Sequence, residues 1–265
     1  MRACVLTIGN EILKGKTVNT NAAEIGRMLY FSGYEIFRGL TVPDIDEEIG
    51  EAFRSLVGVC NVIVSSGGLG PTFDDITIPS FAKAFGIRLV LDEETYEEIR
   101  RKTEAREMKM TKEREKMAMV PEGSKIIKND VGSAPGIEYQ IGQTRIFILP
   151  GVPAEMRSML DRIRNEIALK DSFYYEDSVA IRGVYEASLA PYVNDLMLKY
   201  NGTVYIKSHP AIVPETRESE LEVEVSARSE RLETSRTLVT EVLKEIVKIA
   251  AELKGNRGNR KVDQK

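Results

Sequence analysis

Short apolar runs alternate with stretches of helical period along the first part of the chain, and this alternation constrains the fold more than any single motif. The apolar runs predict strands over 3–8, 34–42 and 61–65. Between them, 20–32 and 45–57 carry apolar side chains at helical spacing. Strands separated by helices of this length form parallel sheets with helices on both faces. We therefore predict an α/β fold whose mostly parallel sheet binds ligands at the carboxyl ends of its strands.

The following segment, 92–119, is dense in charge and almost without an apolar stripe. We predict a solvated helix or helix pair held by ion pairs between residues four apart. A mobile arm or a methionine-rich dimer contact is the alternative. Two further strands, 137–141 and 145–149, predict a hairpin and an antiparallel edge on the sheet. An amphipathic helix is expected over 154–169.

The length and a change of composition indicate two domains. A chain of 265 residues exceeds one small domain, and the composition shifts near Lys170. From there the pattern is strand, helix, strand, strand, helix, which predicts a small α+β domain. We therefore divide the chain into domains at 1–170 and 171–254. The polar tail, 255–265, is expected to be disordered.

Charge and scarce residue types limit the function. A formal net charge of −4 and a pI near 5.4 argue against broad binding to nucleic acid or to an anionic membrane. No apolar stretch approaches the roughly 20 residues of a membrane span, and we expect a cytoplasmic protein. Cys4 and Cys60 lie in apolar runs and are predicted to be buried free thiols, neither a disulfide nor a metal pair. The single histidine, His209, is expected at the surface or in a turn, which almost excludes a histidine base or a multi-histidine zinc site.

A glycine-rich turn, Ser65–Thr77, follows the third predicted strand and precedes a predicted helix over 76–85. Its uncovered backbone N–H groups at a helix start are where anions bind, although glycine clusters also mark ordinary tight turns. The turn matches neither the Rossmann fingerprint nor the P-loop. Asp74 and Asp75 would repel a phosphate unless one caps the helix and the other holds a divalent cation. Asp75 is the stronger candidate for the cation.

Three other polar loops are candidate parts of the same site. The first loop comprises 9–15 and 19–21. There, Glu11 is placed to share a cation with the aspartates, and Asn19 or Thr20 is expected to cap the next helix. Residues 129–136 form a second flexible turn of small residues. In the third loop, 150–156, Glu155 is expected to complement the dipole of the helix that follows.

Together and in this order, these four segments resemble the CinA family, whose amino-terminal domain is similar to the molybdopterin-binding domains of MoaB, MogA and MoeA. The resemblance is strong over 1–170, and 171–254 looks like the family's KH-like domain. The matching residues are Gly9–Leu13, Gly15, Asn19, Thr20, Asn21, Gly67–Thr72, Asp74, Asp75, Thr77, Gly132, Ala134–Gly136 and Leu149–Met156.

The resemblance implies a three-layer α/β fold and a site for a phosphorylated pterin or nucleotide at the strand ends. By position, it implies that Gly67, Gly68 and Gly70 face the phosphate and that Asp75 and Glu11 match the family's acidic residues. Further ligand contacts are implied for Thr72, Asn19, Asn21, Gly151 and Glu155.

Two departures from the family pattern matter. The first loop often has Gly-Asp-Glu, and Asn10 removes one carboxylate here, which weakens a metal site in that loop. The chain also ends where bacterial members continue into a nicotinamide-nucleotide deamidase domain, so that activity is not expected. Because 171–254 has no Gly-x-x-Gly loop, RNA binding gains no support.

The resemblance implies an activity associated with the family, metal-dependent hydrolysis of the diphosphate of ADP-ribose or a related nucleotide. Mg²⁺, Mn²⁺ or Co²⁺ held by Asp75, with Asp74 and Glu11 as helpers, would polarise the phosphoryl oxygens and activate water. The alternatives are a molybdopterin-binding protein of cofactor biosynthesis and a non-catalytic nucleotide-binding module or scaffold. We also expect a homo-oligomer.

Overall fold

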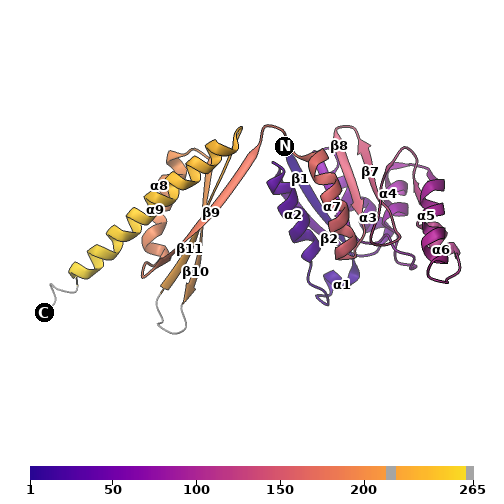
Figure 1. Cartoon of the computed structure of the whole chain (residues 1–265), viewed down its shortest axis with the longest axis horizontal. Helices are drawn as coiled ribbons and strands as arrows, with labels where there is room; N and C mark the ends of the chain where they lie inside the picture. The colour runs from indigo at the N-terminus through magenta and orange to yellow at the C-terminus, as the bar shows by residue number, and fades with distance from the viewer. Residues whose placement is uncertain (213–218, 261–265) are drawn as a thin grey trace. The chain divides into compact units, whose positions relative to one another are not determined.

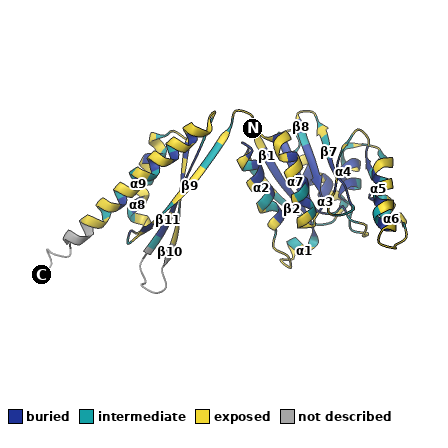
Figure 2. Cartoon of the chain, viewed as in Figure 1, coloured by how far each residue is buried: buried dark blue, intermediate teal, exposed yellow. Residues whose placement is uncertain are grey.

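The computed structural model describes residues 1–212 and 219–260. The chain divides into two compact units, Met1–Ala168 and Leu169–Lys265, each with its own hydrophobic core (Figure 1). In both units the buried residues lie on the strands and on the helix faces that cover them, and the outer helix faces are exposed (Figure 2). No helix within the described ranges is both long and apolar enough to cross a membrane.

The first unit is built on a six-stranded sheet with the strand order β2-β1-β3-β8-β7-β6. The strands β2, β1, β3 and β8 are parallel neighbours, whereas β7 and β6 run antiparallel at one edge. The predicted mostly parallel sheet and its antiparallel edge are therefore confirmed. The strands are β1 (Arg2–Ile8), β2 (Glu35–Val42), β3 (Val62–Ser66), β6 (Lys125–Ile127), β7 (Gly136–Ile141) and β8 (Thr144–Leu149).

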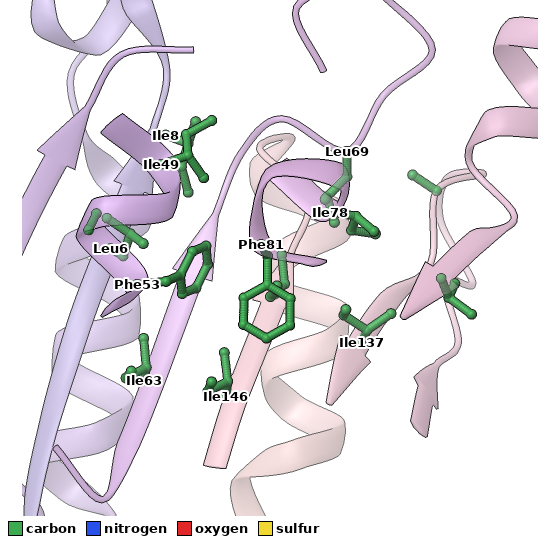
Figure 3. Packing of buried hydrophobic residues seen from close by; sticks show 14 of the residues in the cluster. Leu6, Ile8, Ile49, Phe53, Ile63, Leu69, Ile78, Phe81, Ile137 and Ile146 are labelled. Atoms are coloured by element: carbon green, nitrogen blue, oxygen red, sulfur yellow. The ribbon is translucent and has the colours of Figure 1, made fainter. Parts of the chain in front are cut away.

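Helices cover both faces of this sheet. On one face, α2 (Thr20–Phe31) packs against α7 (Pro153–Ile167) and β1, and α3 (Asp46–Leu56) packs with α4 (Thr77–Phe85) on the other. The side chains of β1 alternate between these layers, so Leu6 joins Phe53 of α3 and Phe81 of α4 in one core cluster (Figure 3). Burial on both faces explains why β1 and β3 contain the apolar runs 3–6 and 62–64 in place of an alternating pattern.

The charged segment forms two helices, α5 (Glu93–Glu104) and α6 (Lys112–Lys116), as predicted. Ion pairs within α5 join Arg100 to Glu97 and Lys102 to Glu98. The segment is enclosed by a small antiparallel pair, β4 (Leu89–Leu91) and β5 (Met119–Pro121). The sequence does not predict β4, β5 or β6, because a strand of three residues is too short to show a period.

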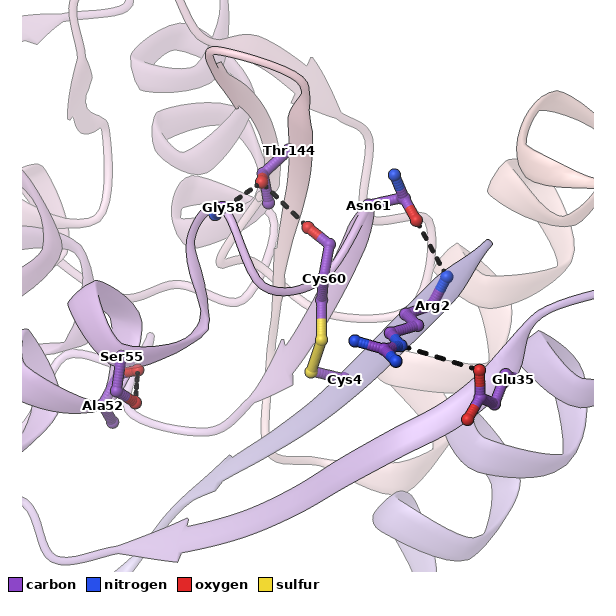
Figure 4. The surroundings of a disulfide bond; sticks show 9 residues. All are labelled: Arg2, Cys4, Glu35, Ala52, Ser55, Gly58, Cys60, Asn61 and Thr144. Carbon is purple, nitrogen blue, oxygen red and sulfur yellow. Dashed lines mark hydrogen bonds and ion pairs between the residues drawn. A yellow bond between two sulfur atoms is a disulfide. The ribbon is translucent and has the colours of Figure 1, made fainter.

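Cys4 and Cys60 form a disulfide, so the prediction of free thiols is wrong (Figure 4). Both residues are buried, as predicted, and their Cα atoms are 6.0 Å apart. The cause is the register of two parallel strands, because Cys4 on β1 lies opposite Ile63 on β3 and Cys60 lies two residues before the start of β3. Periodicity alone does not reveal the strand register that brings together two cysteines 56 residues apart.

The second unit is a three-stranded antiparallel sheet, in the order β10-β11-β9, with two helices packed on it. Alternate residues of β11 are buried, among them Val223 and Val225, as its period of two predicts. His209 is exposed on β10 opposite Glu222, in agreement with its expected surface position. The elements are β9 (Phe173–Arg182), α8 (Glu186–Lys199), β10 (Val204–Ile212), β11 (Ser219–Ser229) and α9 (Leu232–Arg260).

The end of α9 corrects one expectation. Residues 255–260, predicted to begin a disordered tail, continue α9 to Arg260. The rest of the predicted tail, 261–265, lies outside the described residues.

Candidate functional site

A pocket of about 580 Å³ opens in the first unit where β1, β3 and β8 end. Parallel α/β sheets bind ligands at this edge. The pocket brings together nine of the predicted site residues: Glu11, Gly67, Gly68, Gly70, Thr72, Asp74, Asp75, Gly151 and Glu155. Asn19 and Asn21 line a smaller cavity of about 90 Å³, which shares Glu11, Gly67 and Gly151 with the larger pocket.

The smaller cavity surrounds the start of α2. The side chain of Asn19 accepts a hydrogen bond from Ala22 N, so Asn19 caps this helix as predicted. The buried Asn21 amide donates to Ser66 Oγ and to Gly151 O, both at 2.8 Å, and so links α2 to β3 and to the loop after β8. Among the described residues, Asn21 Oδ1 is buried without a hydrogen-bond partner.

The glycine turn is closed by contacts that leave no room for side chains. Gly67 and Gly68 have φ values of 116° and 69°, in the region that favours glycine. A Cβ atom on Gly67 would lie 2.0 Å from Ile8 O, and one on Gly68 would lie 2.2 Å from Thr77 Oγ1. The Thr77 hydroxyl donates to Gly67 O at 2.9 Å, which ties the turn to the first residue of α4.

The backbone amides of the turn have different roles. Gly67 N donates to Leu149 O at 3.0 Å, so this amide joins two strand ends. Gly67 also lines the pocket, and its expected place facing a phosphate stays a prediction. The amides of Gly68, Leu69 and Gly70 donate to no acceptor in the described part of the chain, and all three residues line the pocket. The anion-binding capacity of the turn therefore lies in these three consecutive N–H groups.

Neither aspartate of the turn caps α4, so the capping interpretation is wrong. The N-cap residue is Ile76, and no side chain accepts the helix amides there. Asp75 Oδ2 instead accepts hydrogen bonds from Thr72 N at 2.8 Å and from Thr72 Oγ1 at 2.7 Å. A hydrogen bond from the Thr72 hydroxyl, helped by the backbone amide of Asp74 itself and by the charge of Lys116, holds the pKa of Asp74 below its usual range.

Asp44 also lines the pocket, although the sequence reasoning missed it. Asn10 N donates to Asp44 Oδ2 at 2.8 Å. Burial raises the pKa of Asp44, and the negative charges of Glu11, Asp74 and Asp75 raise it further against the opposing Asn10 bond. The signal that could have found Asp44 is its position two residues after the end of β2, at the same sheet edge as the other loops.

Among the described residues, the candidate metal ligands are not brought into one group. Within 1–212 and 219–260, no three His, Cys, Asp or Glu side chains are grouped closely enough to hold a metal ion. Asp74 and Asp75 both accept a hydrogen bond from the Thr72 hydroxyl, and Asp44 accepts one from the backbone amide of Asn10. A cation shared by Glu11, Asp74 and Asp75 therefore stays a prediction.

A buried asparagine shapes the wall formed by the 129–134 loop. Asn129 Nδ2 donates to Ala134 O and to Glu155 Oε2, both at 2.7 Å. Its Oδ1 accepts from the amides of Val131 and Gly132. Glu155 lies in the first turn of α7, as predicted, and this loop contact holds its carboxylate.

Two arginines from the charged segment complete the pocket. Arg106 and Arg114 are the positively charged residues among its described lining, and Met108 and Met117 lie beside them. The sequence reasoning missed both arginines because the segment was interpreted as a solvated surface. The pocket can thus offer amides and guanidinium groups to an anion, and an apolar wall to a ring.

The fold is that of an α/β protein with a pocket at the carboxyl edge of its mostly parallel sheet. Residues 4–169 match the family described as "Probable molybdopterin binding domain", and the chain belongs to this family. A protein from Caldivirga maquilingensis is 47% identical over 247 residues, which cover 93% of this chain and 96% of the relative. Protein Ta0487 from Thermoplasma acidophilum is 44% identical over 254 residues, 96% of this chain and 98% of its own.

A solved structure shows the same relationship. The crystal structure of "the protein CinA with unknown function" from Thermoplasma acidophilum is 47% identical in sequence to this chain, and it superposes with a TM-score of 0.60. The match covers 63% of this chain and 97% of the chain in that structure. The resemblance to CinA and to molybdopterin-binding domains is therefore confirmed for the first unit. The KH-like character of the second unit and the lack of a deamidase domain stay predictions.

Proposed function

We propose that the first unit binds a small phosphorylated pterin or nucleotide in the pocket at the carboxyl edge of its sheet. The observation that carries this proposal is the run of three amides, Gly68–Gly70, without an acceptor among the described residues. Such amides beside a helix start bind phosphate because their N–H groups and the helix dipole favour negative charge. The volume of about 580 Å³ suits a small organic ligand.

The rest of the pocket suits a ligand that carries a flat ring. Leu69, Met117 and Ala134 are buried and line the same pocket, so they offer an apolar surface. In the adjoining small cavity, Asn21 Oδ1 is a buried acceptor for a ligand N–H or O–H. The family favours a pterin, the alternative that the sequence left open, over ADP-ribose.

Binding is tested by thermal shift and calorimetry with AMP, ADP-ribose and a phosphorylated pterin. Val152→Glu adds a negative charge at an exposed position on the pocket wall. It should weaken binding by about tenfold or more, because it repels the phosphate. Val59→Glu, at an exposed position outside the pocket, is the matched control and should bind like the unmodified protein. If none of the three probes binds, the proposal fails.

Hydrolysis of a bound diphosphate is a separate step from binding. The described carboxylates form no metal-binding group, so the geometry supports binding better than metal-dependent hydrolysis. Incubation with ADP-ribose and Mg²⁺, Mn²⁺ or Co²⁺ tests the activity through the release of AMP and ribose 5-phosphate. Absence of turnover with all three metals would leave a binding protein.

A further inference from the structure

The turn between α5 and α6, residues 105–111, and α6 itself each bring one positively charged side chain to the pocket. Arg106 forms no ion pair with any carboxylate that the structure describes. Arg114 on α6 donates to Lys109 O at 2.7 Å and to Met108 Sδ at 3.3 Å, and both acceptors belong to the turn. Neither charge is therefore cancelled by the acidic residues that line the same pocket, Glu11, Asp44, Asp74, Asp75 and Glu155.

Two lysines tie this turn to other walls of the pocket, one from each flanking helix. Lys102 on α5 donates to Asn129 O at 2.6 Å and to Gly132 O at 2.8 Å. Lys116 on α6 donates to Thr72 O at 2.6 Å and to Asp75 O at 3.0 Å. The segment that carries both arginines is thus anchored to the 129–134 loop at one end and to the glycine turn at the other.

The backbone gives the turn one defined conformation. Thr103 O accepts from the amides of Arg106 at 3.2 Å and Met108 at 3.1 Å, and Glu104 O accepts from Glu107 N at 2.9 Å. Glu107 has a φ of 55°, the left-handed conformation that closes helix ends. Arg106 therefore lies at the carboxyl end of α5, where the helix dipole favours a cation. These bonds argue against the mobile-arm alternative.

We infer that Arg106 and Arg114 recognise an anionic group of the ligand and that Lys102 and Lys116 are positioning residues that hold them at the pocket. The inference rests on the proposed function. Backbone amides carry only partial charge, and five carboxylates line the pocket, so an anion needs a full positive charge nearby. Guanidinium groups supply that charge together with paired hydrogen bonds that match phosphate or carboxylate oxygens.

The test is calorimetry on the full chain with AMP and inorganic pyrophosphate as probes. The double variant Arg106→Gln/Arg114→Gln should bind each probe about ten- to a hundredfold more weakly, and its affinity should depend less on salt. Arg101→Gln is the matched control, because Arg101 is an exposed residue of α5 outside the pocket. Its affinity should equal that of the unmodified protein.

The positioning role has its own readout. Lys102→Met should weaken the binding of both probes, as the double arginine variant does. Lys128→Met removes the other ion-pair partner of Glu98 and should leave binding unchanged. Urea unfolding of each variant separates loss of the fold from loss of recognition. If the unmodified protein binds a probe and the double arginine variant binds it equally well, the inference is wrong and the proposed function stands. If the unmodified protein binds neither probe, the inference fails, whereas the proposed function fails only if ADP-ribose and the phosphorylated pterin also do not bind.

Discussion

Asp44 lines the pocket, where the negative charges of three other carboxylates raise its pKa. Burial is the largest cause of its raised pKa, and Glu11, Asp74 and Asp75 add to it. An Asp whose pKa is raised by folding favours the folded state when protonated and opposes it when ionised. The ionised carboxyl therefore costs stability above the folded pKa, and this cost disappears as the pH falls below the unfolded value.

We predict that Asp44→Asn stabilises the protein at neutral pH. Asn keeps an oxygen for the Asn10 amide but carries no charge to be buried or repelled. The gain in unfolding free energy should be present at pH 7 and should fade in acid, where Asp44 is protonated in both states. Urea unfolding at pH 7 and near pH 3 measures it. Glu51→Gln, at an exposed helix position, is the control and should change little. A loss of stability at pH 7 would contradict the charge argument.

The disulfide gives a second prediction for single residues. Replacing Cys4 and Cys60 together by Ala removes a link between positions 56 residues apart. The chain-entropy model for a loop of this size gives a loss of about 4 kcal/mol in the free energy of unfolding. Denaturant titration of the oxidised protein and the double variant measures this loss. Free thiols in the folded, oxidised protein, detected by mass spectrometry after alkylation, would contradict the pairing.

Apart from Asp44, sequence reasoning found the charged pocket residues that follow strand ends, and it missed those that reach the pocket from the charged segment. Gly68, Thr72 and Asp75 follow β3 directly, so their place at the carboxyl edge comes from the fold class alone. Arg106 and Arg114 come from a charged segment whose pattern shows only a solvated helix pair. Their approach to the pocket depends on tertiary contacts that have no period in the sequence.

At the level of elements, the glycine turn is a rigid joint between β3 and α4. We predict that Gly68→Ala costs about 2–5 kcal/mol, because it combines a left-handed backbone with a Cβ placed 2.2 Å from Thr77 Oγ1. Gly142→Ala is the matched control, since Gly142 has a φ of 56° but open space around it. It should cost only about 1–2 kcal/mol. Equal losses in thermal unfolding would show that the Thr77 contact adds nothing.

The 129–134 loop depends on one buried side chain. Asn129→Ala removes the acceptor of two backbone amides and the donor to Ala134 O and Glu155. We expect a loss of about 2–3 kcal/mol in unfolding free energy, because buried polar groups are left unpaired. Asn165→Ala, at an exposed position on α7, should stay within about 0.5 kcal/mol. A small effect of Asn129→Ala would mean that the loop is held by other contacts.

The long elements were predictable and the short ones were not. Helices such as α3 and α7 repeat their apolar face over three or more turns, and β1, β3 and β8 each contain a run of at least three apolar residues. The three-residue strands β4, β5 and β6 and the four-residue helix α1 (Asn10–Leu13) are fixed by neighbours distant in sequence. The continuation of α9 past Gly255 likewise overrides the low helix propensity of glycine.

For the whole molecule, every described residue that lines the main pocket belongs to the first unit. That unit contains its own buried cluster, a complete sheet and helices on both faces. The family match, over 4–169, covers nearly the same residues. The expected homo-oligomer stays a prediction.

We predict that a fragment of residues 1–168 folds alone and keeps the ligand affinity of the full chain within about twofold. The reason is that every described residue lining the pocket lies in this unit, and parts of a protein that share no contacts contribute independently. Its core does not require β9–β11, since the second unit buries its own cluster around Val223, Val239 and Ile246. Circular dichroism should show one cooperative melting transition for the fragment, and calorimetry with AMP should give matching affinities for fragment and full chain. A folded fragment that binds at least tenfold more weakly would show that the second unit contributes to the site; an unfolded fragment would show that the first core depends on the second.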